Sequence, residues 1–236
     1  MKNLLLILAF LFSIHAFSQQ LTGEQLLEKA IKFHDPNGNW ETFKGAFFVT
    51  MKTPEKPNRV SEIAIDLPKQ LFSVKATSGK NTSEYHIDKD SIQIVFNGAK
   101  STSEEILKKN KLSAARAKMY QDYYTYLYGL PMKLKDPGTI IHKRVNLDKF
   151  MGVEMLVLKV TYPKEIGKDT WYFYFDMDTY KMEAYQFFHD ESKNDGEYIL
   201  LDGLETINGI KMPKKRAWYM NVDAKYLGTD ILKAAN

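Results

Sequence analysis

Alternation of apolar and polar residues over two long stretches is the feature that most constrains how this chain can fold. Between residues 43 and 96, five short apolar runs follow one another, and each ends at Pro, Gly, Asn or Asp. Alternating side chains point to opposite faces of a strand, and no helical spacing lies between the runs. Five successive strands joined by short turns predict an antiparallel meander.

The strand pattern returns after the turn at 136–138 and continues to the end of the chain. Strands are predicted around 156–162, 171–175, 185–187, 197–204 and 216–222. Nine of the nineteen residues from 171 to 189 are aromatic, and they fall on both strand faces. A sheet with one face in water does not need aromatic residues on both faces of its strands. Either protein covers both faces, or one face lines an apolar cavity.

Two helical regions accompany the strands. Residues 21–33 carry an apolar stripe at helical spacing, with Thr22 at the start and turn residues 35–38 at the end. A second helical region is predicted at 103–128, where Ser101 and Glu104 have the spacing of a capping box. The fold class is therefore mainly β (α+β), a curved antiparallel sheet or half-open β-barrel covered by an N-terminal and a mid-chain helix.

The mid-chain helix is rich in tyrosine. Tyr120, Tyr124 and Tyr128 recur at i, i+4 spacing, and a second apolar stripe includes Met119 and Tyr123. A helix that is apolar over much of its circumference is typically covered on more than one side. The tyrosine hydroxyls need polar partners, which favours a cavity wall or an interface over a dry core.

The first eighteen residues have the pattern of a cleavable signal peptide. Lys2 precedes the apolar run 4–12, and Ala16 and Ser18 place small residues at the two positions that a signal peptidase reads. We expect residues 1–18 to be removed and residues 19–236 to form a single half-barrel domain. The absence of Cys excludes lipidation after this signal. The predicted location is periplasmic or secreted, with no transmembrane segment in the mature chain.

Several chemistries are disfavoured by composition. The absence of Cys excludes thiol catalysis and thiolate metal sites, and the four mature His residues have no metal-ligand spacing. A formal charge of +4 is too small to indicate a nucleic-acid partner. The basic run 212–216 is interpreted as a solvated strand start. The sequence thus predicts no catalytic residue, no cofactor and no metal.

Three residues remain as candidates for chemistry. His34 ends the first helix, where we interpret it as a side chain that complements the helix dipole. Asp195 and Glu197 flank a glycine and could act in acid–base chemistry, but Asn194-Asp195-Gly196 is also a hairpin-turn signal. These residues keep an envelope-associated hydrolase open as a rival function.

Four motifs, at 126–139, 167–176, 194–199 and 226–232, resemble signatures of an uncharacterised family of exported proteins from Bacteroidota. The resemblance covers nearly the whole mature chain and implies no assigned activity. In element order the chain also resembles the periplasmic lipoprotein-sorting (LolA/LolB-like) half-barrels. That resemblance implies a concave apolar face that is closed by helices and receives acyl chains.

The leading hypothesis is a carrier or binding protein for a hydrophobic small molecule or acyl chain, such as a lipid or an acylated envelope protein. A ligand-free module that docks through the tyrosine-rich helix is the other alternative. Ordinary core packing is the competing explanation for the same aromatic residues. The candidate ligand-binding residues are Tyr120, Tyr124, Tyr128, Met132, Trp171, Phe173 and Phe187.

The exported chain should begin at Gln19, because residues 16–18 follow the apolar run at the spacing that signal peptidase requires. N-terminal sequencing of protein recovered from the periplasm or the medium checks this expectation. Recovery of a chain that still carries Met1 would contradict it.

Overall fold

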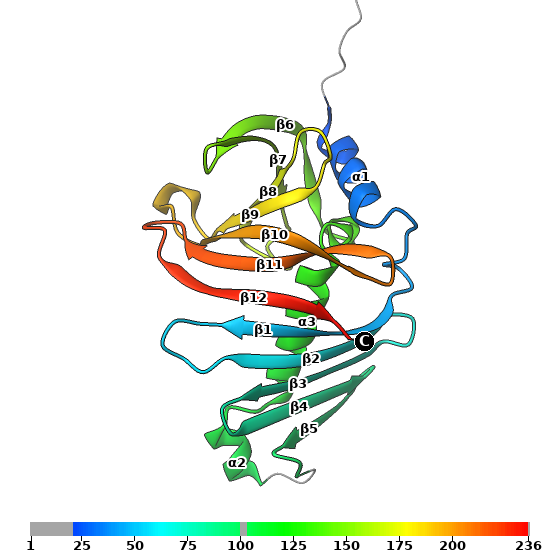
Figure 1. Ribbon diagram of the computed structural model, residues 1–236, viewed down its shortest axis with the longest axis vertical. Helices are drawn as coiled ribbons and strands as arrows, with labels where there is room; N and C mark the ends of the chain where they lie inside the picture. The colour runs from blue at the N-terminus through cyan, green and yellow to red at the C-terminus, as the bar shows by residue number, and fades with distance from the viewer. Residues whose placement is uncertain (1–20, 100–102, 236) are drawn as a thin grey trace, which may run out of the picture.

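A computed structural model describes residues 21–99 and 103–235 of the chain. Its strands form one antiparallel sheet in the order β5-β4-β3-β2-β1-β12-β11-β10-β9-β8-β7-β6 (Figure 1). The strands are β1 (Lys44–Lys52), β2 (Arg59–Asp66), β3 (Leu71–Ser78), β4 (Asn81–Asp88), β5 (Ser91–Phe96), β6 (Ile140–Phe150), β7 (Val153–Thr161), β8 (Thr170–Phe175), β9 (Met182–Phe188), β10 (Glu197–Ile207), β11 (Ile210–Met220) and β12 (Tyr226–Ala234). The predicted fold class is confirmed.

Two meanders make up the sheet, and one pairing joins them. Every pairing other than β1 with β12 connects strands that are consecutive in the sequence. β1 and β12 pair antiparallel, with Phe47 opposite Ala234 and Val49 opposite Leu232. Because Phe47, Val49 and Leu232 are all buried, this seam is also part of the hydrophobic core.

The described residues also form five helical segments. They are α1 (Gly23–His34), α2 (Glu104–Lys109), α3 (Ala114–Gly129) and the 3-10 turns η1 (Met132–Lys135) and η2 (Glu191–Lys193). Thr22 caps α1 with a reciprocal capping box that includes Gln25. The N-cap of α2 is Ser103, whose hydroxyl accepts from the Ile106 N–H at 3.4 Å. The predicted cap, Ser101, lies outside the described residues, as does the signal-peptide segment.

α3 crosses one face of the sheet, because β5 and β6 lie at its opposite edges and the chain between them has to pass from one edge to the other (Figure 1). Tyr120, Tyr124 and Tyr128 point from α3 into the core and are buried. The ring centroids of Tyr128 and Phe47 are 4.9 Å apart, and those of Tyr120 and Tyr85 are 5.5 Å apart. The tyrosine stripe therefore packs directly against the inner face of the sheet.

Arg216 corrects the interpretation of residues 212–216 as a solvated strand start. Lys214 and Lys215 are exposed, but Arg216 is fully buried on the inner face of β11. Its guanidinium donates to the carbonyls of Leu127 and Pro213, both at 2.9 Å, and lies 4.0 Å from the Tyr128 ring centroid. Leu127 is in the last turn of α3, where carbonyls have no partner within the helix. Arg216 is buried because it caps this helix.

Replacing Arg216 by Ala should lower the free energy of unfolding by about 3 kcal/mol, because the buried Leu127 carbonyl loses its donor and a cavity forms beside Tyr128. Urea unfolding checks this loss. Lys215→Ala, one residue away on the exposed side of β11, is the matched control and should change stability by less than about 1 kcal/mol. Equal effects of the two changes would contradict the capping role.

Candidate functional site

An open cavity of about 730 Å³ lies beside α3, along the side of the helix that flanks the buried tyrosine stripe. One wall is the polar side of α3, from Lys118 to Tyr126. The opposite walls are the turns after β2 and β4 and the loop between β7 and β8. The cavity is therefore built where loops from distant parts of the sheet approach the same helix.

Aromatic and aliphatic side chains from separate elements form the apolar part of this cavity. Tyr126 of α3, Tyr162 and Ile166 of the β7–β8 loop, and Trp171 of β8 all line it. The hydroxyls of Tyr126 and Tyr162 share a hydrogen bond of 2.9 Å, and Tyr126 meets the Trp171 ring edge-on at 5.9 Å. Burial raises the pKa of Tyr126 well above its usual value, so this hydroxyl stays protonated and uncharged.

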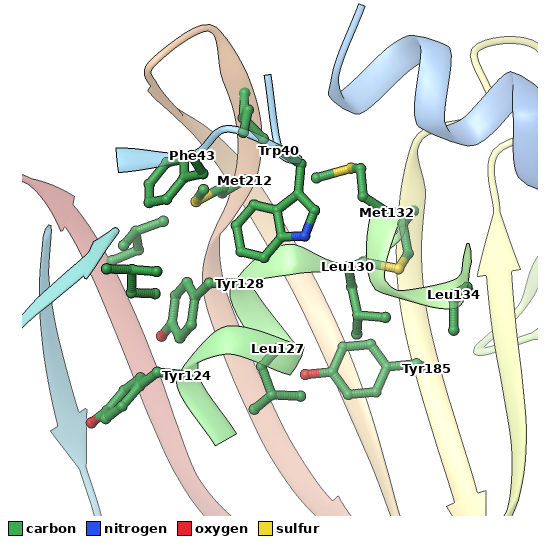
Figure 2. Packing of buried hydrophobic residues seen from close by; sticks show 14 of the residues in the cluster. Trp40, Phe43, Tyr124, Leu127, Tyr128, Leu130, Met132, Leu134, Tyr185 and Met212 are labelled. Carbon is green, nitrogen blue, oxygen red and sulfur yellow. The ribbon is translucent and has the colours of Figure 1, made fainter. Parts of the chain in front are cut away.

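Five of the predicted ligand-binding residues lie in the hydrophobic core. Figure 2 shows three of them, Tyr124, Tyr128 and Met132, packed around the C-terminal half of α3 among Trp40, Phe43 and Tyr185. All five are buried in one cluster, and none of them lines the cavity; they are Tyr120, Tyr124, Tyr128, Met132 and Phe173. These side chains fill the space between helix and sheet.

The other two predicted residues lie at or beside the cavity. Trp171 lines it directly, and the Phe187 ring packs against Trp171 with centroids 4.8 Å apart. Tyr162 and Ile166 were not among the predicted ligand-binding residues. Tyr162 was placed at the end of a predicted strand, and Ile166 lies in a loop that carries no periodic pattern. Its only sequence signal is that Ile166 is an aliphatic residue within a charged loop, and in the structure its side chain is 60% exposed.

His34 has a structural role that the sequence did not indicate. Its Nδ1–H donates to the Lys211 carbonyl at 2.6 Å, and its Nε2 accepts from the Met182 N–H at 3.0 Å. Burial lowers the pKa of His34 from 6.5 to about 4, so the ring is neutral near pH 7. The interpretation of His34 as a complement to the helix dipole is therefore wrong. The ring joins α1 to β9 and β11, and both nitrogens are engaged.

Asp195 and Glu197 do not converge on a reacting centre. The Asp195 carboxylate accepts from the backbone N–H groups of His189 and Asp190 at 2.9 and 2.8 Å, as a turn-forming residue does. Glu197 is half-buried beside Phe187 in the next strand, and burial raises its pKa. Within 21–99 and 103–235, no three His, Asp or Glu side chains are arranged to hold a metal ion.

Residues 1–233 match a family described as a family of unknown function, DUF6503. The chain belongs to the DUF6503 family. Among curated protein sequences, none matches this DUF6503 protein. In the described part of the chain, no helix has the length and apolar character needed to cross a bilayer.

Several solved structures align with most of this DUF6503 chain, although their sequence identity to it is low. A LolA superfamily protein from Nitrosomonas europaea has a TM-score of 0.49 and 9% identity, covering 90% of this chain and 91% of that chain. A candidate outer membrane lipoprotein-sorting protein domain from Vibrio parahaemolyticus has a TM-score of 0.47 and 11% identity, with 91% and 92% covered. A DUF1329 family protein from Desulfovibrio piger has a TM-score of 0.47 and 9% identity, with 90% and 91% covered.

The buried neutral state of His34 predicts a pH dependence of stability. Below pH 6.5 the unfolded chain binds a proton at His34 that the folded protein excludes until about pH 4. The contribution of neutral His34 to the free energy of unfolding is therefore fully present above pH 6.5. It falls by about 3 kcal/mol between pH 6.5 and 4.

His34→Gln should make the free energy of unfolding less dependent on pH in that range, as measured by urea denaturation at several pH values. His86→Gln, a change on an exposed position of β4, should keep the wild-type slope. If His34→Gln also keeps it, the ring does not control this pH response.

Proposed function

We propose that this DUF6503 protein is a periplasmic or secreted carrier that binds a hydrophobic or amphiphilic small molecule in the cavity beside α3. The observation that carries the proposal is an open cavity of about 730 Å³ whose apolar part contains Trp171, Tyr126 and Ile166. Sites for small molecules are typically about 300–1,000 Å³ and combine apolar walls with a few polar groups.

Burial of apolar ligand surface supplies the affinity in this proposal. Each 100 Å² of apolar surface removed from water contributes about 2.5 kcal/mol, so an acyl chain binds usefully without a charged anchor. Trp171 offers a broad ring, and Phe187 packs against it and fixes its orientation. The hydrogen-bonded hydroxyls of Tyr126 and Tyr162 place a polar edge beside this apolar surface.

The buried tyrosine stripe has an indirect part in the same proposal. Tyr120, Tyr124 and Tyr128, with Met132 and Phe173, fix α3 against the sheet. A wall whose position is fixed by packing keeps the cavity open before a ligand arrives, which limits the ordering cost of binding. Trp171 and Phe187 then shape the surface that contacts the ligand. The five core residues hold α3, which forms the opposite wall of the cavity.

Ile166→Asp should weaken binding of a fluorescently labelled fatty acid by at least about fivefold, because the new carboxylate is placed against the apolar chain. Val222→Asp is the matched control, since Val222 is 63% exposed and Ile166 60%, and Val222 lies in the turn between β11 and β12, outside the cavity lining. Fluorescence titration and thermal melts of both variants check the result. Absence of probe binding to the wild type would refute the proposed function.

A further inference from the structure

Charged side chains of both signs surround the cavity. Five carboxylates and three ammonium groups line it, and they are Asp66, Asp90, Asp122, Asp136, Asp169, Lys89, Lys118 and Lys133. The excess of carboxylates would favour a cationic ligand if all of these groups were available. Their availability depends on which of them already pair within the protein.

Three of the carboxylates and one lysine already have partners. Asp66 lies 3.7 Å from the Lys44 ammonium, Asp169 bonds to the His189 ring at 2.7 Å, and Asp136 pairs with Lys133. The hydrogen bond that the Asp169 carboxylate accepts from the His189 ring raises the pKa of His189, which strengthens this pair toward lower pH. Asp66, Asp136, Asp169 and Lys133 are therefore already engaged by partners within the protein.

Two carboxylates and two ammonium groups remain at the cavity. Among the described side chains, Asp90, Asp122, Lys89 and Lys118 have no opposite charge within 4 Å. The Lys118 ammonium donates only to the neutral amide of Gln121, at 3.2 Å. The unpaired charge at the cavity therefore sums to zero.

Each wall carries one charge of each sign. Lys89 and Asp90 are adjacent in the turn between β4 and β5, and Lys118 and Asp122 are one helical turn apart on α3. An ionic head group between these walls meets attraction and repulsion of similar size, while it still loses water. A hydroxyl or a zwitterion can use the carboxylates as acceptors and the ammonium groups as donors.

We propose that the cavity selects amphiphiles whose polar head group has no net charge, either uncharged and hydroxyl-rich or zwitterionic. The apolar chain lies against Trp171 and Ile166, and the head group lies between Lys118 and Asp122 on one wall and Lys89 and Asp90 on the other. This inference rests on the proposed function, because it assumes that the cavity binds an apolar chain.

Four ligands with the same twelve-carbon chain test the inference by isothermal titration calorimetry below their micelle concentrations, at pH 7. They are dodecyl maltoside, dodecylphosphocholine, dodecanoate and dodecyltrimethylammonium. At least one of the two net-neutral ligands should bind about tenfold more tightly than either ion, and the tighter of the two identifies the head-group chemistry.

The other outcomes separate this inference from the proposed function. Equal binding of all four ligands, or tightest binding of either ion, overturns the head-group inference and leaves the hydrophobic-ligand function in place. Absence of binding by all four ligands overturns both.

Charge-removing substitutions on α3 give a second, reciprocal test. Asp122→Asn should tighten dodecanoate binding several-fold and weaken dodecyltrimethylammonium, and Lys118→Gln should do the reverse. Asp178→Asn, in the exposed turn after β8, removes the same charge as Asp122→Asn away from the cavity and should change neither. Thermal melts confirm that all three variants fold. If Asp122→Asn and Asp178→Asn have the same effect, the unpaired charges do not face the ligand.

Discussion

The pairing of β1 with β12 determines the rest of the architecture. It joins two meanders that would each otherwise end in an open edge, and it places β5 and β6 at the far edges of the combined sheet. The chain between those edges has to cross the sheet, and α3 is the segment that does so (Figure 1). The tyrosines of α3 then fill the space between the helix and the sheet, so the open volume lies beside the helix, where loops approach it.

Polar groups make the contact between α3 and the sheet more specific than apolar packing alone. Tyr123 donates to the buried carboxylate of Asp230 at 2.8 Å, and Tyr124 donates to Ser61 at 2.9 Å. Asp230 stands opposite Arg216 in the β11–β12 register, and burial raises its pKa. Hydrogen bonds of this kind have directional requirements, so they fix the rotation and the axial position of the helix in a way that interchangeable apolar contacts do not.

The sequence predicted most strands and both main helices, because alternation and helical spacing are local patterns. It did not single out β6, where Val145 is the only buried residue among eleven, so the strand has no apolar face to recognise. Arg216 was misread because its partner, the Leu127 carbonyl, is distant in sequence and belongs to the backbone. Trp171, which lines the cavity, was singled out by its aromatic surroundings. Tyr162 and Ile166 were not, because their significance arises only where two loops meet across α3.

The seam between the first and last strands also sets the order in which the protein can be completed. The hairpins of each meander bring together residues that are close in the sequence, and contacts of this kind form early and quickly. Strand β1 has to wait until residues 226–234 are available before its second edge is covered. During synthesis this edge keeps unpaired N–H and C=O groups, which can form hydrogen bonds with a strand of another chain. The sheet is therefore exposed to mispairing until the last nine-residue strand is in place.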